Sequence, residues 1–284
     1  TAVGLTDEPS TDGGKKFAQT WPADVHLVGK DILRFHAVIW PAMLMAAGLE
    51  VPKKVFAHGW LLVGGEKMSK SKLTGIAPSQ ITDHFGVDAF RYYFLRAIPF
   101  GSDGSFSWED MSARYTSELA NDFGNLASRL AAMVEKYCDG ILPEKSEDSE
   151  LKAALEKTVA NSDKAMCALD FQGGINTIMD FCKAANGYVT AKEPWSVAKD
   201  PSRKSELDEI LYNTAESLRA LAILLHPIMP ISTQKLWNSL GAEGSLGPIG
   251  KQKIADVARW GQLIPGTKVS KGEILFPRLP ELES

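Results

Sequence analysis

A short basic stretch, Lys67-Met68-Ser69-Lys70-Ser71, carries the strongest chemical signal in the sequence. It holds two ammonium groups and two hydroxyls, and Gly64-Gly65 just upstream can act as a hinge. Lysines meet phosphate oxygens as compact charges, so such a loop suits a triphosphate. Charges of this kind contribute most where negative charge develops in a transition state. The plain alternative is an exposed basic hairpin tip with no function.

A second group of residues combines Gly29-Lys30-Asp31 with Phe35-His36 and Trp40. It lies where an expected strand ends and a helix begins, which is the usual ligand side of a parallel sheet. Asp31 can accept a hydrogen bond from a ribose hydroxyl. His36 and Trp40 are four residues apart and therefore share a helix face. The alternative interpretation makes Trp40 a core residue and His36 its neighbour.

A third group lies in the second half of the chain, in Asn125-Leu126-Ala127-Ser128-Arg129 and Glu193-Pro194-Trp195. Asn125 and Arg129 are spaced to share one helix face. Asn and Arg side chains can read the edge of an unstacked base, and a Trp ring can stack on it. Judged on spacing alone, a polar surface pair and a buried Trp explain the pattern as well.

The basic stretch resembles the KMSKS signature of class I aminoacyl-tRNA synthetases. The flanks His58-Gly59-Trp60 and Phe85-Gly86-Val87-Asp88-Ala89-Phe90-Arg91-Tyr92-Tyr93 look like the same family's flanks. The resemblance implies that the loop closes on the phosphates of ATP while the amino acid attacks the α-phosphate. It assigns catalysis to Lys67 and Lys70. It assigns ATP binding to these two lysines and to His58, Met68, Ser69 and Ser71.

The pattern G-K-D-x-x-x-F-H followed by W-P-A is similar to that of the methionyl-tRNA synthetases in particular. The resemblance implies that Gly29, Lys30 and Asp31 bind ATP, with Asp31 near the ribose. It places His36 and Trp40 in the methionine pocket, where an aromatic and apolar lining suits a polarisable thioether.

The N-L-A-S-R run and the P-W pair match the positions at which methionyl-tRNA synthetases recognise the CAU anticodon. The resemblance therefore assigns anticodon binding to Asn125, Arg129 and Trp195. The matches follow the family's order through three separated regions, which favours the functional interpretation.

Two signatures of the resembled family are missing from the sequence. The five histidines, at positions 26, 36, 58, 84 and 226, do not form an H-x-G-H motif. The three cysteines, Cys138, Cys167 and Cys182, include no C-x-x-C pair, so we expect no zinc site in this chain. Thr1-Ala2-Val3-Gly4-Leu5 resembles the segment after the family's W-L-D-A loop. We therefore expect a C-terminal half, with the H-x-G-H motif and a zinc-bearing insertion in a missing N-terminal half.

The elements that must position these residues alternate in type in the first part of the chain. Apolar runs predict strands at 25–28, 55–58 and 60–63, and helical spacing predicts a helix over 32–47, with Asp31 as N-cap and Gly48 as its stop. This order indicates a parallel βαβ unit with too few strands for a complete doubly wound sheet. Residues 21–66 alone should expose an apolar surface. Residues 1–20, polar and Gly-rich, are expected to form a loop.

The rest of the sequence predicts mostly helix, punctuated by prolines and glycines. Short loops between neighbouring helices favour an antiparallel bundle, with a tail that packs back on the body. The expected helices are 83–98, 109–138, 148–168, 171–192, 204–226 and 231–240, followed by a helix at 251–260 and a strand at 273–276.

The fold class expected is therefore an α/β partial Rossmann-like nucleotide-binding domain followed by an all-α anticodon-binding helical bundle. We place the catalytic part at 1–74, a small mixed linker that contacts the tRNA stem at 75–114, and the helical domain with its tail at 115–284. The bundle itself should span 115–240.

The composition bounds these interpretations. The 284 residues carry a net charge of −4, so charge alone does not favour a nucleic-acid binder, although a local basic patch remains compatible. A hydrophobic fraction of 44% supports a core. Sparse cysteines suit a reducing cytosol, and no apolar run is long enough to cross a membrane.

The resemblance implies a cytoplasmic bacterial ligase that activates methionine with ATP and Mg²⁺ and transfers it to tRNA(Met). The fragment alone should be inactive without its N-terminal half. Two alternatives stay open at this point. One is a class I synthetase for leucine, isoleucine, valine or cysteine, and the other is a non-catalytic tRNA-binding fragment.

Overall fold

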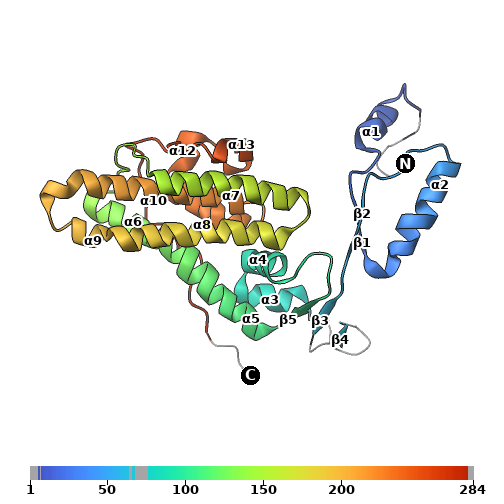
Figure 1. Ribbon diagram of the computed structural model, residues 1–284, viewed down its shortest axis with the longest axis horizontal. Coiled ribbons are helices and arrows are strands. Elements are labelled where there is room, and N and C mark those ends of the chain that lie inside the picture. Colours follow the sequence, from blue (N-terminus) through green and yellow to red (C-terminus); the bar gives the residue numbers. More distant parts are fainter. Residues whose placement is uncertain (1–5, 7, 64–65, 68–75, 281–284) are drawn as a thin grey trace. The chain divides into compact units, whose positions relative to one another are not determined.

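The computed structural model describes residue 6 and residues 8–63 and 76–280, together with the backbone of residues 66–67. The chain forms two compact units (Figure 1). The first comprises Thr1–Leu73 and Phe100–Ser105, and the second comprises Thr74–Pro99 and Phe106–Ser284. The domain boundaries expected near residues 74 and 114 stay a prediction.

The first unit is built around two parallel strands joined through helical turns. Strand β1 (His26–Gly29) pairs in parallel with β2 (Val55–His58). The connection contains a 3₁₀ turn (Lys30–Ile32), a π-helical turn (Phe35–Ile39) and helix α2 (Trp40–Ala46). The predicted strand–helix–strand order is confirmed.

Both ends of the predicted helix over 32–47 can be compared with the structure. Gly48 takes a left-handed φ of 71° directly after the helix, which is the conformation that glycine adopts most easily at a helix end. The predicted N-cap is wrong, because Asp31 lies inside the 3₁₀ turn and Gly29 precedes it with no side-chain cap. The helical path starts at Lys30 with the 3₁₀ turn, so Asp31 is already part of the helix and cannot cap it.

Residues 12–20 form helix α1 (Asp12–Thr20), so the expectation of a loop there was wrong. The Thr11 side chain caps the helix by accepting a hydrogen bond from the Gly14 N–H at 3.0 Å. The rings of Phe17 and Trp21 stack at its other end, with centroids 6.4 Å apart. These contacts offset the low helix propensity of the Gly-Gly pair.

A small sheet has the strand order β4-β3-β5. Strand β3 (Leu61–Val63) is antiparallel to β4 (Glu66–Lys67), and the third strand is β5 (Gly104–Phe106). The Gly104 N–H donates to the Trp60 carbonyl oxygen at 2.9 Å, so the segment from Phe100 returns to the first unit.

The second unit begins with two helices where one was expected over 83–98. Gly86 has φ of 83° and separates α3 (Pro78–Phe85) from α4 (Val87–Ala97). A long helical path follows: α5 (Trp108–Arg114), a π-helical segment (Tyr115–Gly124) and α6 (Asn125–Cys138). The predicted helix over 109–138 is confirmed, with a change of helix type inside it.

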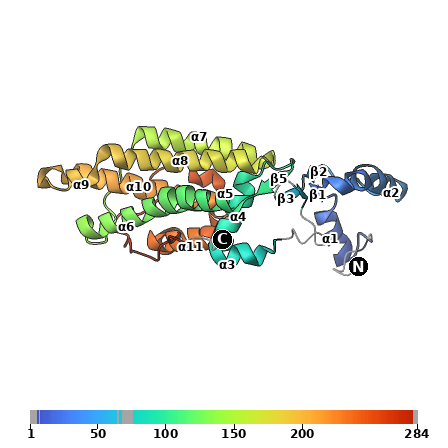
Figure 2. The same ribbon diagram turned by 90° about the horizontal axis from the view of Figure 1, so that it is seen from below.

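The remaining helices form the bundle predicted from the sequence. Helices α7 (Ser149–Cys167) and α8 (Phe171–Lys192) run side by side in both views (Figure 1; Figure 2). Helix α10 (Lys204–Leu225) is buried along most of its length. The other elements are α9 (Pro194–Val197), a 3₁₀ turn (Pro201–Arg203) and α11 (Pro230–Ser239). Helical spacing, and the prolines and glycines between the helices, predicted α7, α8, α10 and α11 closely.

The tail packs on the helices, as expected, but its elements differ from the prediction. It contains α12 (Ala242–Leu246), a 3₁₀ turn (Ile249–Lys251) and the short α13 (Ile254–Val257) in place of a helix over 251–260. Residues 273–276 form no strand. Phe276 is buried there against Tyr115, with ring centroids 5.9 Å apart, so an apolar anchor accounts for the hydrophobic run.

Across the described residues, none of the helices combines the length and the apolar character that crossing a bilayer requires.

Candidate functional site

The carboxyl ends of the two parallel strands bring three sequence-predicted residues together. Gly29 and His58 are register partners at the last position of β1 and β2. A Cβ on Gly29 would lie 2.6 Å from an Asp31 carboxylate oxygen and 3.9 Å from the His58 ring. Asp31 is exposed, so its carboxylate can accept hydrogen bonds from a ligand. The edge is where ligands bind in parallel sheets.

Lys30, predicted to bind ATP, is held by a residue that the sequence did not single out. Its ammonium group donates to both carboxylate oxygens of Asp103, at 2.6 and 2.7 Å. It also lies 4.1 Å from the centre of the Trp60 ring. Asp103 accepts a further hydrogen bond from the Trp60 N–H at 2.8 Å. The hydrogen bond from Lys30, and next that from Trp60, lower the pKa of the Asp103 carboxyl group.

His58 is fixed from two sides. Its Nδ1 lies 2.9 Å from the Gly59 carbonyl oxygen, and its ring stacks on Phe100 with centroids 6.4 Å apart. Phe100 also stacks on Phe56 at 4.7 Å. Gly59 is needed here, because a Cβ would come within 2.1 Å of the Ser102 carbonyl oxygen. The segment 100–105 therefore covers the end of β2 at close range.

His36 and Trp40 meet on one face of the connecting helix, as their spacing predicted. Together with His26, Phe35, Ile39 and Met43 they line an open hollow in the first unit. The His26 and His36 rings meet edge to face, with centroids 6.2 Å apart. His36 Nδ1 lies 3.0 Å from the Ile32 carbonyl oxygen, which orients the ring.

Two polar atoms at this hollow are buried without a hydrogen-bond partner among the described residues: Trp40 Nε1 and His26 Nδ1. Buried polar atoms normally have partners, so such atoms mark a place where a ligand or further protein can supply them. The lining is aromatic and contains a thioether, which suits a small apolar ligand.

The basic loop can be located only in part. The backbone of Lys67 pairs with Leu62 in the β3–β4 hairpin. Met68, Ser69, Lys70 and Ser71 lie outside the described residues, and the side chain of Lys67 does too. The catalytic and ATP-binding roles of these five residues stay predictions.

The first unit exposes many large apolar side chains, as predicted for residues 21–66. Among its described residues, the buried hydrophobic side chains are Val28 and Leu44. Five others are more than half exposed: Leu27, Phe35, Val38, Met43 and Met45. Monomeric proteins seldom expose apolar side chains in such a cluster, so this surface is suited to being covered.

The second unit, called the helical unit from here on, brings Arg129 and Trp195 together although 66 positions separate them. The guanidinium carbon lies 5.3 Å from the centre of the indole ring. Trp195 is 38% exposed, so it is not the buried core residue of the plain alternative. Asn125, one turn before Arg129, is exposed as well. Glu193 in a left-handed conformation and Pro194 at the first turn of α9 set the corner that carries the indole.

Two residues of the flank downstream of the basic loop tie α4 to the bundle. Arg91 donates to the carbonyl oxygens of Ile228 and Pro227, both at 2.8 Å. An Asp88 carboxylate oxygen accepts from the Ser232 N–H at the start of α11, at 2.5 Å. The sequence pattern singled out this flank as a family feature. The structure shows that its side chains hydrogen-bond α4 to the segment 227–232 of the bundle.

A second connection, which the sequence did not reveal, centres on Glu118 in the π-helical segment. Its carboxylate accepts a hydrogen bond from the Tyr92 hydroxyl at 2.6 Å and forms ion pairs with Arg96 and Arg114, both at 3.1 Å. Burial, and next the charge of Glu118, raise the pKa of Tyr92. No local spacing could have found the contacts between α4 and this segment, because they join separate elements.

Comparison with protein families divides the chain into two matched regions. Residues 3–131 match the family described as tRNA synthetases class I (M). Residues 148–258 match the family described as the anticodon-binding domain of tRNA ligase. The first match contains the strand edge, the hollow and the basic loop, and the second contains Trp195.

Several similar proteins are methionine–tRNA ligases. The methionine–tRNA ligase of Streptomyces coelicolor is 62% identical over 99% of this chain and 53% of its own length. The methionine–tRNA ligase of Caldanaerobacter subterraneus subsp. tengcongensis is 46% identical over 95% of this chain and 42% of its own length. The chain thus spans about half the length of the curated relatives it matches.

Solved structures agree with these relatives. The chain is similar to free Mycobacterium tuberculosis methionyl-tRNA synthetase, with a TM-score of 0.83 and 34% identity over 97% of this chain and 53% of that one. The same enzyme bound to methionyl-adenylate gives a TM-score of 0.84 and 34% identity, over 95% and 52% of the two chains. The similarity is continuous through both units, and the chain belongs to the methionyl-tRNA synthetases, a family of class I aminoacyl-tRNA synthetases.

Proposed function

We propose that this chain provides the KMSKS loop, part of the ATP and methionine sites, and the anticodon-binding domain of a methionine–tRNA ligase. The observation that carries the proposal is the aromatic hollow of His36 and Trp40, in the same unit as the strand edge of Gly29, Asp31 and His58. The solved relative that binds methionyl-adenylate supports a site for this class of ligand.

The proposed first step joins methionine to the α-phosphate of ATP. The methionine carboxylate oxygen attacks the α-phosphorus, the bond to the bridging oxygen breaks, and pyrophosphate leaves with its electron pair. Lys67 and Lys70 stabilise the charge that develops on the phosphates, and Met68, Ser69 and Ser71 complete the loop. Mg²⁺ is held by the hard phosphate oxygens of the nucleotide. In the second step a hydroxyl of the terminal ribose of tRNA(Met) attacks the carbonyl carbon of methionyl-adenylate, the bond from that carbon to the phosphate oxygen breaks, and AMP leaves as the hydroxyl proton is released.

The described residues can take distinct parts in this reaction. Asp31 accepts hydrogen bonds from the ribose, and Gly29 leaves room for the nucleotide at the strand edge. Lys30 is proposed to act near ATP while paired with Asp103, which sets the place of its ammonium group. His36 and Trp40 enclose the methionine side chain, whose thioether makes favourable contacts with aromatic rings.

The exposed apolar face of the first unit supports a further part of this proposal. Two parallel strands are too few to bury the side chains of a doubly wound sheet, and Leu27, Phe35 and Val38 are mostly exposed. We propose that sequence equivalent to the other half of the relatives covers this face. That half would bring the H-x-G-H motif and a zinc-bearing insertion. This chain alone should therefore not form methionyl-adenylate.

The proposed tRNA contact is the CAU anticodon at Asn125, Arg129 and Trp195. Trp195 offers a partly exposed ring for stacking, and Arg129 and Asn125 offer hydrogen-bond donors to a base edge. The proposed location is the cytoplasm, where tRNA is charged.

Methionine-dependent exchange between ATP and pyrophosphate tests the catalytic part. The 284-residue chain is combined with the unmatched half of the Streptomyces relative, and exchange is measured with methionine, leucine, isoleucine, valine and cysteine. We expect exchange with methionine alone, and none from either half by itself. Lys70→Ala should slow exchange by about 2–4 kcal/mol in activation free energy, the usual effect of removing one transition-state donor.

The outcomes separate the alternatives. Faster exchange with another amino acid would indicate a synthetase for that amino acid. Correct assembly of the two halves, seen as a stable complex, with no exchange would indicate a non-catalytic tRNA-binding chain. Exchange by the 284-residue chain alone would contradict the proposed division of the site.

A further inference from the structure

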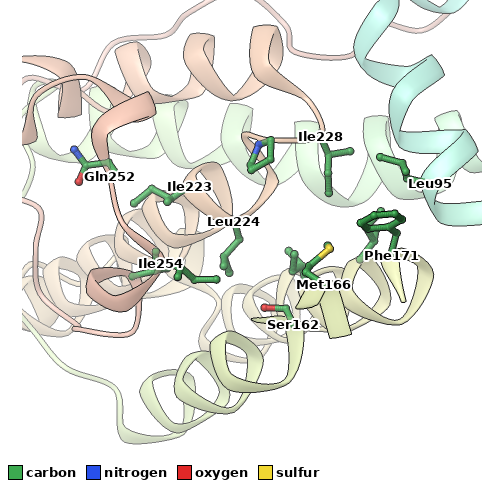
Figure 3. A pocket seen from close by; sticks show the side chains of 13 residues that line it. Leu95, Ser162, Met166, Phe171, Ile223, Leu224, Ile228, Gln252 and Ile254 are labelled. Atoms are coloured by element: carbon green, nitrogen blue, oxygen red, sulfur yellow. The ribbon is translucent and has the colours of Figure 1, made fainter. Parts of the chain in front are cut away.

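The helical unit contains an apolar cavity of about 390 Å³ that plays no part in the proposed reaction. Its walls come from α4, α7, α8 and α10 and from the tail segment around α13 (Figure 3). Ile175, Ile178 and Leu224 form deeply buried parts of the wall. Ile254, which is 42% exposed, and the exposed Pro227 place its mouth at the surface.

The lining provides almost no polar chemistry. Among the lining residues, Ser162 and Gln252 have the polar side chains, and none is charged. The Ser162 hydroxyl donates to the Val159 carbonyl oxygen at 3.2 Å, and the Gln252 amide nitrogen donates to the Leu246 carbonyl oxygen at 2.9 Å. In Figure 3 the Gln252 amide lies at the edge of the cavity. A charged or strongly polar ligand would lose its hydration here without replacement.

Size and shape narrow the class of ligand further. An apolar cavity of roughly 150 Å³ holds one benzene molecule, so the volume found here accommodates one or two fused rings. The Phe171 ring and the Met166 thioether lie close together on the same side of the cavity (Figure 3). Rings and thioethers both pack favourably against aromatic ligands.

We propose that the helical unit binds a neutral aromatic molecule of one or two fused rings in this cavity. Such a ligand would contact Leu95 of α4 together with the bundle helices. Arg91 of α4 bonds to the backbone of Pro227 and Ile228, and both of these residues line the cavity. Occupancy therefore stabilises the connection between α4 and the bundle. The site does not depend on the proposed catalytic role.

Binding of toluene to the full 284-residue chain tests the proposal, with benzoate as the matched charged ring. Toluene should shift the methyl NMR signals of Met166 and Ile223 in a saturable way. At about ten times its dissociation constant it should raise the melting temperature of the helical unit by about 3–6 °C. Benzoate should do neither, because its carboxylate cannot be solvated in the cavity.

Two variants locate the bound ring. Ile223→Phe fills the cavity and should abolish both effects, whereas Ile141→Phe, the same change at an exposed position outside it, should preserve them. If circular dichroism shows that Ile223→Phe does not fold, Ile254→Trp serves as the test variant. A larger ring at the exposed mouth should weaken toluene binding at least about tenfold. The absence of a saturable shift, equal shifts with benzoate, or unchanged binding in a folded cavity variant would overturn the site.

Discussion

The contact between Arg129 and Trp195 joins two chemistries that recognition of an unpaired base requires. Arg129 lies over the indole at 5.3 Å, so a cation–π interaction holds both side chains in place. The indole is still 38% exposed, which leaves ring surface for a second stacking partner. Because each side chain restrains the other, little ordering of these two side chains is left for a binding step.

Removal of the indole should affect tRNA and leave methionine activation alone. Trp195→Ala should lower kcat/KM for aminoacylation by about 1–3 kcal/mol, the usual worth of one base–aromatic stack. Trp195→Phe is the matched control and should retain most of the effect of the ring. Pyrophosphate exchange should be unchanged in both variants of the assembled enzyme. A loss of exchange equal to the loss of aminoacylation would mean that Trp195 acts on folding instead.

Asp103 should make the stability of the first unit depend on pH in the acid range. Its pKa is lowered in the folded chain, first by the Lys30 ammonium and next by the Trp60 N–H. A lowered folded-state pKa means that the contribution to stability is present above the ordinary value, about 3.9, and is lost as the pH falls through the folded value.

The expected result concerns the segment that Asp103 anchors. Amide exchange at Trp60 and Gly104 should become faster, relative to the intrinsic rate, as the pH falls below about 4. Asp103→Asn should show the faster exchange already at neutral pH and lose the dependence. Asp24→Asn removes a more exposed carboxylate that pairs with Lys53, and it should leave this segment unchanged. Retained pH dependence in Asp103→Asn would assign the effect to another group.

Residue spacing predicted part of the candidate site and could not predict the rest. His36 with Trp40 and Asn125 with Arg129 are local pairs, which helical periodicity fixes directly. Gly29 was singled out at the expected end of a strand, and His58 was singled out through the family resemblance of its flank; the structure pairs them at the ends of β1 and β2. Asp103 pairs with a lysine 73 positions away, and no local pattern carries that information.

At the scale of elements, the return of segment 100–105 to the first unit depends on a close backbone approach. A Cβ at Gly59 would lie 2.1 Å from the Ser102 carbonyl oxygen and 2.4 Å from the Asp103 backbone nitrogen. Both neighbours are backbone atoms, so neither can move aside as a flexible side chain would. The hydrogen bond between Gly104 and Trp60 and the Phe56–Phe100 stack depend on the same approach.

Gly59→Ala should therefore detach this segment. We expect destabilisation of the first unit by about 1–3 kcal/mol, the usual cost of forced overpacking. Gly187→Ala on α8 is the matched control, because its Cβ position has no atom within 4 Å other than those of its chain neighbours and of the backbone of its own helix. It should be neutral or stabilise the helix by up to about 1 kcal/mol. Hydrogen exchange of the two units measures both effects. An equal loss of stability in the two variants would contradict the assignment of the loss to the clash at Gly59.

Long helices with regular helical spacing were predictable, and elements held by tertiary contacts were not. Helices α7, α8 and α10 follow directly from periodicity. Helix α1 depends on a cap and a ring stack at its ends, which outweigh two glycines. Residues 273–276 have the composition of a strand, but burial of Phe276 against Tyr115 fixes them without a partner strand. Burial of the Tyr115 hydroxyl raises the pKa of that group to about 12.

At the scale of the whole molecule, the two units differ in how much apolar surface they bury. The helical unit buries long runs of α10, together with an ion pair between Glu216 and Arg219 at 2.7 Å. The described part of the first unit buries the hydrophobic side chains of Val28 and Leu44 alone. Hydrophobic burial is the main source of stability, so the first unit should be the less stable one.

Unfolding of the chain should therefore proceed in two steps. Native-state hydrogen exchange should show residues 21–63 opening at a lower free energy than residues 205–225. Addition of the unmatched half of the Streptomyces relative should protect residues 21–63 and leave residues 205–225 unchanged. Opening of both segments in one cooperative step would contradict the difference in stability.

The π-helical segment Tyr115–Gly124 gives the long helix a definite phase. Each residue of an α-helix turns the chain by about 100°, so deletion of one residue within that segment would rotate everything after it by this angle. Asn125 and Arg129 would then leave the side on which Trp195 stands. The number of residues in this π-helical segment therefore fixes two directions at once. Within the segment, Glu118 faces α4, and after it, Asn125 and Arg129 lie on the side of the proposed anticodon contact.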